Sequence, residues 1–257
     1  MTKKQKKTHN KFNYWLSYFR KNEKHFDNIL NCPLDKELSL NEIHIIEGSI
    51  QQFQKGENSE GKHLIAYAQK HGDKSYLETI KLFIKEEQKH ALVLAKFMKA
   101  NNIEKIKDHW VDNTFRSLRK LTALENSIIV LLTAEIIAAI YYLALRECTT
   151  SKTLKAICDQ ILLDEEMHIN FQSYTLRQFY KNKSLTAKIY SRLFHRILMT
   201  GTILVVWLYH KPVLRLGGFS LPHFYRSVFN EYHRSEKMIK MKNLSIQLKH
   251  MIHTAQI

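Results

Sequence analysis

Helix-breaking residues are scarce in this chain, whose 257 residues include only 7 glycines and 3 prolines. Because glycine and proline interrupt helices, long stretches without them favour a mostly helical protein. Apolar residues make up 44% of the chain and charged residues 25%, as in soluble globular proteins. The length suffices for one large domain with a hydrophobic core. We therefore predict an all-α fold.

Cysteine is equally sparse. Cys32, Cys148 and Cys158 have no C-x-x-C spacing, which argues against a disulfide framework and favours a reducing compartment. The lysine-rich start of the chain is not followed by the apolar segment of a secretory signal. We therefore expect a cytoplasmic protein, with peripheral attachment to a membrane as an alternative.

Acidic residues are scarce at both ends of the chain, so the net charge of +16 is unevenly distributed. Residues 1–30 contain 8 Lys and Arg against 2 acids, and residues 177–257 contain 14 against 2. Residues 31–176 are close to neutral. The basic flanks could bind an anionic partner, either lipid or RNA, or they could simply be solvated surface.

The pattern of apolar residues divides the chain into three parts. Residues 1–38 are predicted to form a basic tail and an amphipathic helix at 12–30. Residues 39–181 are predicted to form a four-helix bundle. Residues 182–257 are predicted to form a basic helical extension packed on that bundle.

Within the bundle, apolar residues recur at helical spacing in four long segments. These segments lie at 39–71, 74–100, 117–147 and 152–181. Asp73 and Ser151 are expected N-caps of the second and fourth helices. A polar crossover at 103–116 separates the two helix pairs.

The extension contains a further helix, predicted at 185–211. Its apolar run from Ile197 to Tyr209 is 13 residues long, whereas a membrane span needs about 20. This helix is therefore expected to be buried or to touch a membrane. Pro212 is expected to end it, and a basic helical tail is expected from about Leu221.

Two Glu-x-x-His steps lie inside the predicted helices, and each has a lone glutamate 30 positions upstream. The residues are Glu57, Glu87 and His90 in one half, and Glu135, Glu165 and His168 in the other. The halves are offset by 78 positions, which predicts a duplicated helix hairpin. Residues three apart share one face of a helix, so the glutamate and histidine of each step can bind the same ion.

All four of these glutamates are predicted to lie at one level of the bundle, because residues equidistant from a hairpin turn face each other. The midpoint of the first pair is Gly72 and that of the second is Thr150, both in predicted turns. Four carboxylates and two imidazoles make an oxygen-rich site that suits Fe or Mn better than structural Zn. The pattern therefore predicts one two-metal site.

Single Glu-x-x-His steps are a weak signal, because a buried salt-bridged pair has the same spacing. A third copy, Glu60 to His63, has no counterpart 78 positions further on. Glu60 and Glu47 are alternative ligands to Glu57 if the first helix is rotated.

Three further residues could support the ligands. Glu86 and Asp164 lie four positions before the two histidines and could orient them, although exposed helix-end acids are an equal interpretation. Tyr142 lies two turns beyond Glu135 and could face the site, with a core tyrosine as the alternative.

The ligand set resembles that of the ferritin-like di-iron carboxylate superfamily, over about residues 39–181. The resemblance implies a four-helix bundle with two Fe ions that react with dioxygen or peroxide; Mn at either position is an alternative. The chain lacks the rubredoxin-like cysteine motif of a complete rubrerythrin. Its additional helices fit an enzyme with a covered pocket better than an iron-storage shell.

The expected function is a non-haem di-iron oxidoreductase, an oxygenase or oxidase acting as a homodimer on a small-molecule or lipid substrate with an external electron donor. In this scheme Glu57 and Glu135 are terminal or bridging ligands, and Glu87 and Glu165 bridge. His90 and His168 each cap one iron. The alternatives are a ferroxidase or peroxide-handling protein, a hydroxylase directed to tRNA or lipid by the basic flanks, and a non-catalytic binding protein.

Overall fold

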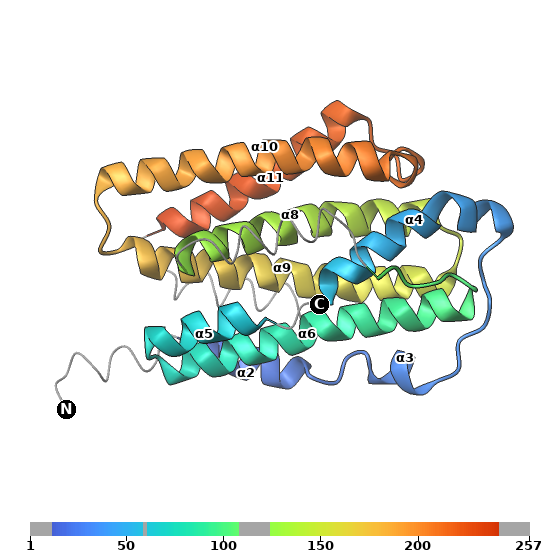
Figure 1. Ribbon diagram of the computed structural model, residues 1–257, viewed down its shortest axis with the longest axis horizontal. Helices are drawn as coiled ribbons and strands as arrows, with labels where there is room; N and C mark the ends of the chain where they lie inside the picture. The colour runs from blue at the N-terminus through green and yellow to red at the C-terminus, as the bar shows by residue number, and fades with distance from the viewer. Residues whose placement is uncertain (1–11, 59–60, 108–123, 242–257) are drawn as a thin grey trace.

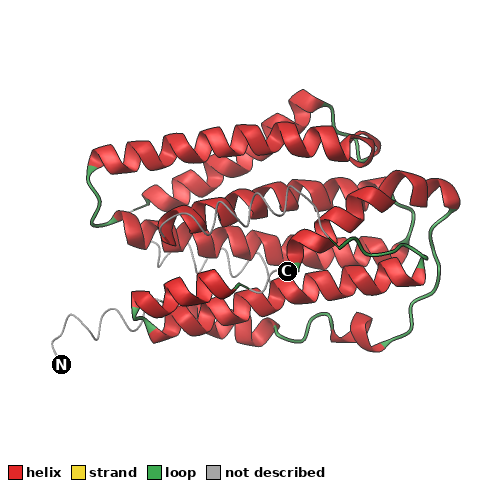
Figure 2. Ribbon diagram, in the orientation of Figure 1, coloured by secondary structure: helices red, strands yellow, loops and turns green. Residues whose placement is uncertain are grey.

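The computed structural model describes residues 12–58, 61–107 and 124–241, which form helices without a strand (Figures 1 and 2). The predicted all-α fold is thus confirmed for this part of the chain. The basic tail at 1–11, most of the crossover and the start of the third helix lie outside the described residues. So does the chain beyond residue 241.

Three long helices form the centre of the molecule: α6 (Lys74–Ala100), α8 (Leu124–Cys148) and α9 (Lys152–Tyr180). The predicted N-caps of α6 and α9 are confirmed. The Asp73 carboxylate accepts a hydrogen bond from the Tyr76 backbone at 3.0 Å, and the Ser151 hydroxyl accepts one from the Leu154 backbone at 3.0 Å. These caps satisfy amide groups that would otherwise be unpaired at the helix start.

The prediction of a single helix at 39–71 was wrong. It is divided into α4 (Leu40–Glu57) and α5 (Lys62–His71). Gly61 lies between them with φ of +60°, a conformation that favours glycine, and a Cβ atom there would overlap the Ile84 side chain. Glu57 is therefore the last residue of α4 rather than the middle of a long helix.

The amphipathic helix predicted at 12–30 is also divided, into α2 (Asn13–Asn22) and α3 (Asp27–Asn31), with a turn between them. Trp15 and Phe19 of α2 are buried, and both short helices pack on α6 (Figure 1). The turn places His25 beside the centre of the bundle, as described below.

Pro212 does not end the fifth helix, contrary to prediction. α10 runs from Leu185 to Leu216 through Pro212, and α11 follows at Leu221–Lys240. A proline removes one helical hydrogen bond and frees the carbonyl four residues earlier, on Leu208. Both residues are exposed, so water can satisfy that carbonyl. α10 packs on α8 and α4, and α11 packs on α9 and α8.

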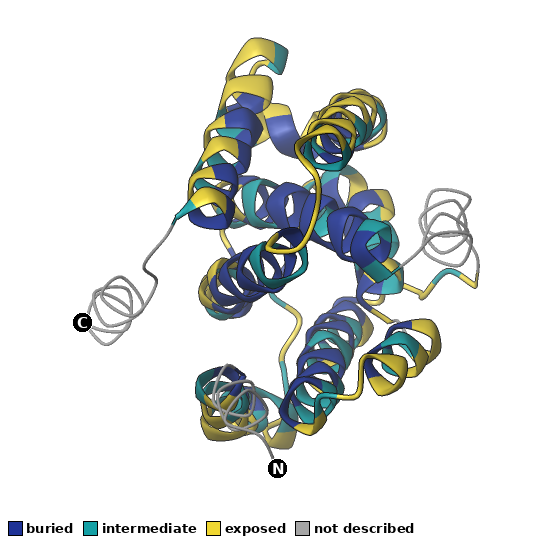
Figure 3. Cartoon of the chain, turned by 90° about the vertical axis from the view of Figure 1, so that its left-hand side faces the viewer, coloured by how far each residue is buried: buried dark blue, intermediate teal, exposed yellow. Residues whose placement is uncertain are grey.

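The hydrophobic core consists of two clusters with a polar layer between them. On α6, the buried apolar residues between Tyr76 and Ile84 belong to one cluster. Those between Val93 and Met98 belong to the other. The buried residues face the middle of the bundle, as the end view shows (Figure 3). Glu86, Glu87 and His90 fall between the two clusters, in the polar layer.

Candidate metal centre

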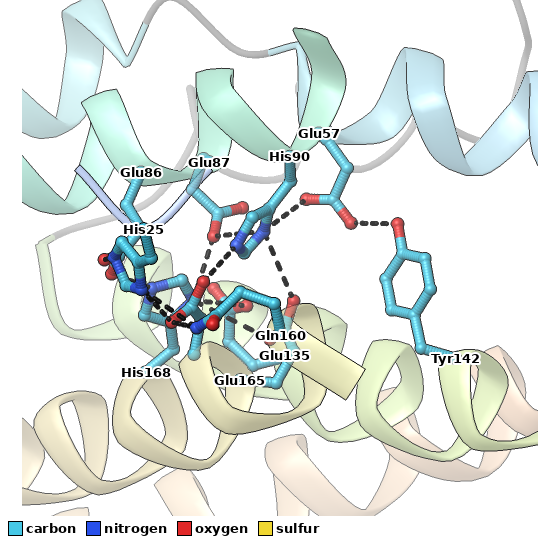
Figure 4. A network of polar contacts seen from close by, with 11 residues as sticks. His25, Glu57, Glu86, Glu87, His90, Glu135, Tyr142, Gln160, Glu165 and His168 are labelled. Atoms are coloured by element: carbon cyan, nitrogen blue, oxygen red, sulfur yellow. Dashed lines mark hydrogen bonds and ion pairs between the residues drawn. The ribbon is translucent and has the colours of Figure 1, made fainter. Parts of the chain in front are cut away.

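The structure brings all six predicted ligands into this polar layer, from four helices (Figure 4). Two groups form, and within each the candidate ligand atoms lie within 4.8 Å of one another. The first contains Glu57, Glu87, His90 and Glu165, and the second contains Glu87, Glu135, Glu165 and His168. Glu87 and Glu165 belong to both groups. A buried cluster of carboxylates and imidazoles of this kind could hold metal.

Around His90, the spacing leaves room for an ion. The Nδ1 atom lies 4.0 Å from Glu57 Oε2, 3.8 Å from Glu87 Oε1 and 3.9 Å from Glu165 Oε1. These separations are too long for hydrogen bonds. Two atoms that each bind a metal at about 2.1 Å can be up to about 4.2 Å apart.

Around His168, the arrangement is similar. Its Nδ1 atom lies 3.7 Å from Glu135 Oε2 and 3.7 Å from Glu165 Oε2. Glu87 Oε1 is closer and forms an ion pair with this Nδ1 atom at 2.9 Å. The two imidazole rings are 5.7 Å apart between centroids.

The inward-facing atoms of the cluster are the ones left without hydrogen bonds. Among the described residues, the buried atoms that lack a hydrogen-bond partner include His90 Nδ1, His168 Nδ1, Glu87 Oε1 and both carboxylate oxygens of Glu165; their contacts with one another are ion pairs. Burying a polar atom without a partner costs about 1–3 kcal/mol, and more for a charged group. Cation binding would offset that cost, because these atoms are the donors a metal needs.

The outward-facing nitrogens of both histidines have partners, and the pairing crosses between helices. His90 Nε2 lies 3.0 Å from Asp164 Oδ2 on α9, and His168 Nε2 lies 2.9 Å from Glu86 Oε2 on α6. We expected each acid to orient the histidine on its own helix, but each contacts the histidine of the other. A carboxylate that accepts the outer N–H fixes the ring and directs Nδ1 toward the metal.

His25 also contacts this site, although it was not among the predicted site residues. Its Nε2 atom lies 3.1 Å from Glu86 Oε1, and its Nδ1 atom lies 3.4 Å from Asp164 Oδ1 and 2.9 Å from Gln160 Nε2 (Figure 4). Gln160 also donates to Asp164 Oδ1 at 3.1 Å. One side chain from the α2–α3 turn therefore contacts both acids that hold the histidines. No spacing rule could have found it, because it lies 61 residues from Glu86.

Tyr142 contacts the site through Glu57, the lone glutamate of the first half. Its hydroxyl donates a 2.6 Å hydrogen bond to Glu57 Oε1, so it does face the cluster, although not by way of Glu135. Glu47 is half-buried and belongs to neither group. Glu60 lies outside the described residues.

The pKa values of the cluster residues are shifted by burial and by the neighbouring charged side chains. Burial, with the neighbouring carboxylates, raises the pKa of Glu57 and Glu165 well above the ordinary value. Burial acts to lower the pKa of His168, but the surrounding carboxylates raise it well above its usual range. Burial would also raise the pKa of Glu86, yet the hydrogen bonds to His168 and His25 lower it to about 2. Without a metal, Glu57, Glu165 and His168 should therefore keep their protons to a higher pH than the same side chains in water.

Aromatic rings surround both histidines. Phe26 meets His90 edge-on at 5.7 Å between centroids, while Phe83 meets His168 at 4.8 Å and Phe19 stacks on it at 5.9 Å. Apolar walls exclude water, which strengthens every charge interaction inside them.

The fold and site thus define an all-α protein with a buried carboxylate–histidine cluster suited to metal binding. Comparison of the chain with protein-family models, curated proteins and solved structures finds no match.

Proposed function

We propose that this protein is a non-haem di-iron oxidoreductase of the ferritin-like kind, which uses dioxygen and an external electron donor. The observation that supports this most strongly is the sharing of Glu87 and Glu165 by two ligand groups. Each group also contains one lone glutamate and one histidine of its own. This is the ligand pattern of carboxylate-bridged metal pairs in helix bundles: one Glu from each of two helices and Glu-x-x-His from the other two.

Iron is favoured over zinc by the donor atoms. Four carboxylates and two imidazoles provide mainly hard oxygen ligands, and cysteine is absent from both groups. Two iron ions held there would supply the redox chemistry with dioxygen. The chain's own residues would orient the ligands: Asp164 and Glu86 hold the two imidazoles, and Tyr142 holds the Glu57 carboxylate.

The direct test is to load the purified protein with ferrous iron without oxygen, then measure bound iron and oxygen uptake on adding air and a reductant. We expect two irons per chain and catalytic oxygen uptake. Glu165→Ala should lose both irons, because Glu165 serves both groups. Glu166→Ala is the matched control, since Glu166 is the next residue and is exposed; it should bind iron normally.

Two outcomes contradict different parts of the proposal. Two irons retained by the Glu165→Ala variant would contradict the ligand assignment. Full iron loading of the wild-type protein without oxygen uptake would contradict the oxidoreductase function and leave the metal site intact.

A further inference from the structure

The long helix α10 has two apolar faces, and only one of them is covered by the described residues. Its inner face packs on α8 and α4 and buries Met199, Ile203 and Val206. Its outer face exposes Ile189, Leu193, Ile197, Leu204 and Leu208, each between 51% and 73% exposed. Their spacing of four and seven residues places them in one stripe along the helix. In Figure 3, the helices at the top of the view are coloured as exposed along their outer sides.

Charge on α10 is of one sign. None of its 32 residues is acidic, and its five cations are Lys188, Arg192, Arg196, Lys211 and Arg215. Between Arg196 and Lys211 there are 14 uncharged residues, about 21 Å of helix. Lys188, Arg192 and Arg196 therefore lie beside the first part of the apolar stripe, and Lys211 and Arg215 lie beyond its other end. Of these cations, Arg192 is paired with Glu236 of α11 at 3.3 Å.

α10 is one of two described helices, with α8, that are long and apolar enough to span a membrane by length and composition. In α8 the most apolar window is 78% buried within the protein, whereas in α10 that fraction is 44%. A helix that is covered on one side and exposed on the other fits a position parallel to a membrane surface. Helices of this kind insert their apolar face to the level of the headgroups while lysine and arginine contact anionic lipid.

We propose that the outer face of α10 is a docking surface for an anionic lipid bilayer. A second copy of the chain fits less well, because paired stripes would bring the cations of both copies together with no acid on α10 to compensate. RNA would match the cations but would leave the aliphatic stripe exposed to water. An anionic bilayer complements both features at once. This inference does not depend on the metal centre.

The test is sedimentation of the full-length protein with vesicles, either of phosphatidylcholine alone or of phosphatidylcholine mixed with phosphatidylglycerol. We expect binding to the mixed vesicles, weaker binding at high salt because the charges are screened, and little binding to the neutral vesicles. The triple variant Ile197→Gln/Leu204→Gln/Leu208→Gln should reduce the partition coefficient at least about tenfold, because it removes the inserted apolar surface.

The matched control is Leu92→Gln/Leu163→Gln, which changes leucines that are 57% and 51% exposed on α6 and α9. It should bind like the wild-type protein, and thermal unfolding should show that both variants remain folded. Equal loss in the control and the triple variant would overturn the proposal, as would salt-insensitive binding to neutral vesicles. A wild-type dimer that the triple variant converts to a monomer, without vesicle binding, would instead assign the face to a second copy. RNA binding that survives the triple variant, without vesicle binding, would assign the cations to RNA.

Discussion

The two halves of the candidate metal centre reach the same arrangement through different backbones. In the second half, Glu135 lies inside the continuous helix α8, which is joined to α9 by a short turn. In the first half, Glu57 is the last residue of α4, and a break separates it from α5. The 30-residue spacing from each lone glutamate to its Glu-x-x-His step is nevertheless the same. Ligand position is thus common to the two halves, whereas helix continuity is not.

The break follows from local sequence. Gly61 corresponds to Ala139 at the 78-residue offset, and Asn58 corresponds to Ile136. Glycine adopts the positive φ that the first half requires, whereas alanine and isoleucine continue the helix of the second half. Because Glu57 lies at a helix end, its carboxylate depends more on the hydrogen bond from Tyr142. Removing a ligand or a supporting residue from one half should therefore not have the same effect on metal binding as removing its counterpart from the other half.

Among changes confined to one half, the largest effect should come from removing its lone glutamate. Glu57→Ala and Glu135→Ala should each reduce bound iron from two ions to one, because each glutamate belongs to only one ligand group. Iron analysis after gel filtration measures this. Loss of both ions from either variant would mean that the two positions fill only together, and no loss from either would mean that neither residue is a ligand.

His25→Ala should affect the two halves equally. Its side chain contacts both Glu86 and Asp164, and removal of such a supporting residue typically costs about 10–100-fold in metal affinity. Competition with a chelator, using cobalt as a spectroscopic probe, measures both affinities. Added imidazole should partly restore them, because the side chain of His25 is 15% exposed. His44→Ala, at an exposed position on α4, is the control.

A different result would change the role of His25. If the wild-type protein bound three cobalt ions and His25→Ala bound two, His25 would itself be a ligand. If the variant lost metal affinity at only one of the two positions, His25 would not support both halves equally.

Metal affinity should increase with pH. Glu57, Glu165 and His168 all have pKa values raised above their ordinary range, so we expect metal binding to displace protons from these groups. Each proton released near neutral pH lowers affinity about tenfold for each unit that the pH falls. Calorimetry of metal binding in buffers of different ionisation enthalpy counts these protons. A count of zero at pH 7 would contradict the protonated resting state.

Tyr142→Phe should weaken the first half alone. The substitution removes the hydrogen bond to Glu57 and keeps the ring, so we expect a loss of roughly tenfold at one ion and little change at the other. The chelator competition that resolves two affinities applies here as well. An equal loss at both positions would mean that Tyr142 acts through the shared ligands instead.

The smallest effect on the site should come from the backbone break itself. Gly61→Ala forces a side chain into a left-handed conformation against Ile84 and should lower the free energy of unfolding by about 1–3 kcal/mol. The reciprocal change, Ala139→Gly, should cost about 1 kcal/mol for glycine inside a helix. Urea unfolding of the metal-free proteins measures both. A Gly61→Ala variant as stable as the wild-type protein would show that a side chain at position 61 is not strained.

Much of this arrangement could be predicted because it depends on spacing along a helix. The bounds of α6 and α9, their caps and the convergence of the six candidate ligands all follow from periodicity and equal distances to a turn. The break after Glu57 could not be predicted from the apolar stripe, since Leu64 and Ala68 continue the stripe across it. Gly61 was the available signal, but a glycine is tolerated inside many helices.

Contacts between helices were less predictable. The crossed pairs of His90 with Asp164 and His168 with Glu86 depend on which side chains face each other, whereas sequence distance favours partners on the same helix. His25 lies in a turn that was predicted as helix, and its partners are on α6 and α9. Tertiary packing determines such contacts, and periodicity within one segment carries no information about them.

The central claim is that Glu87 and Glu165 hold two ions close together. X-ray absorption spectroscopy of the iron-loaded protein tests it most directly. We predict scattering from a second iron at about 3.5–4 Å, as in other two-metal sites, together with a first shell of oxygen and nitrogen. An iron-loaded protein without metal–metal scattering, or one with a sulfur ligand, would contradict this account.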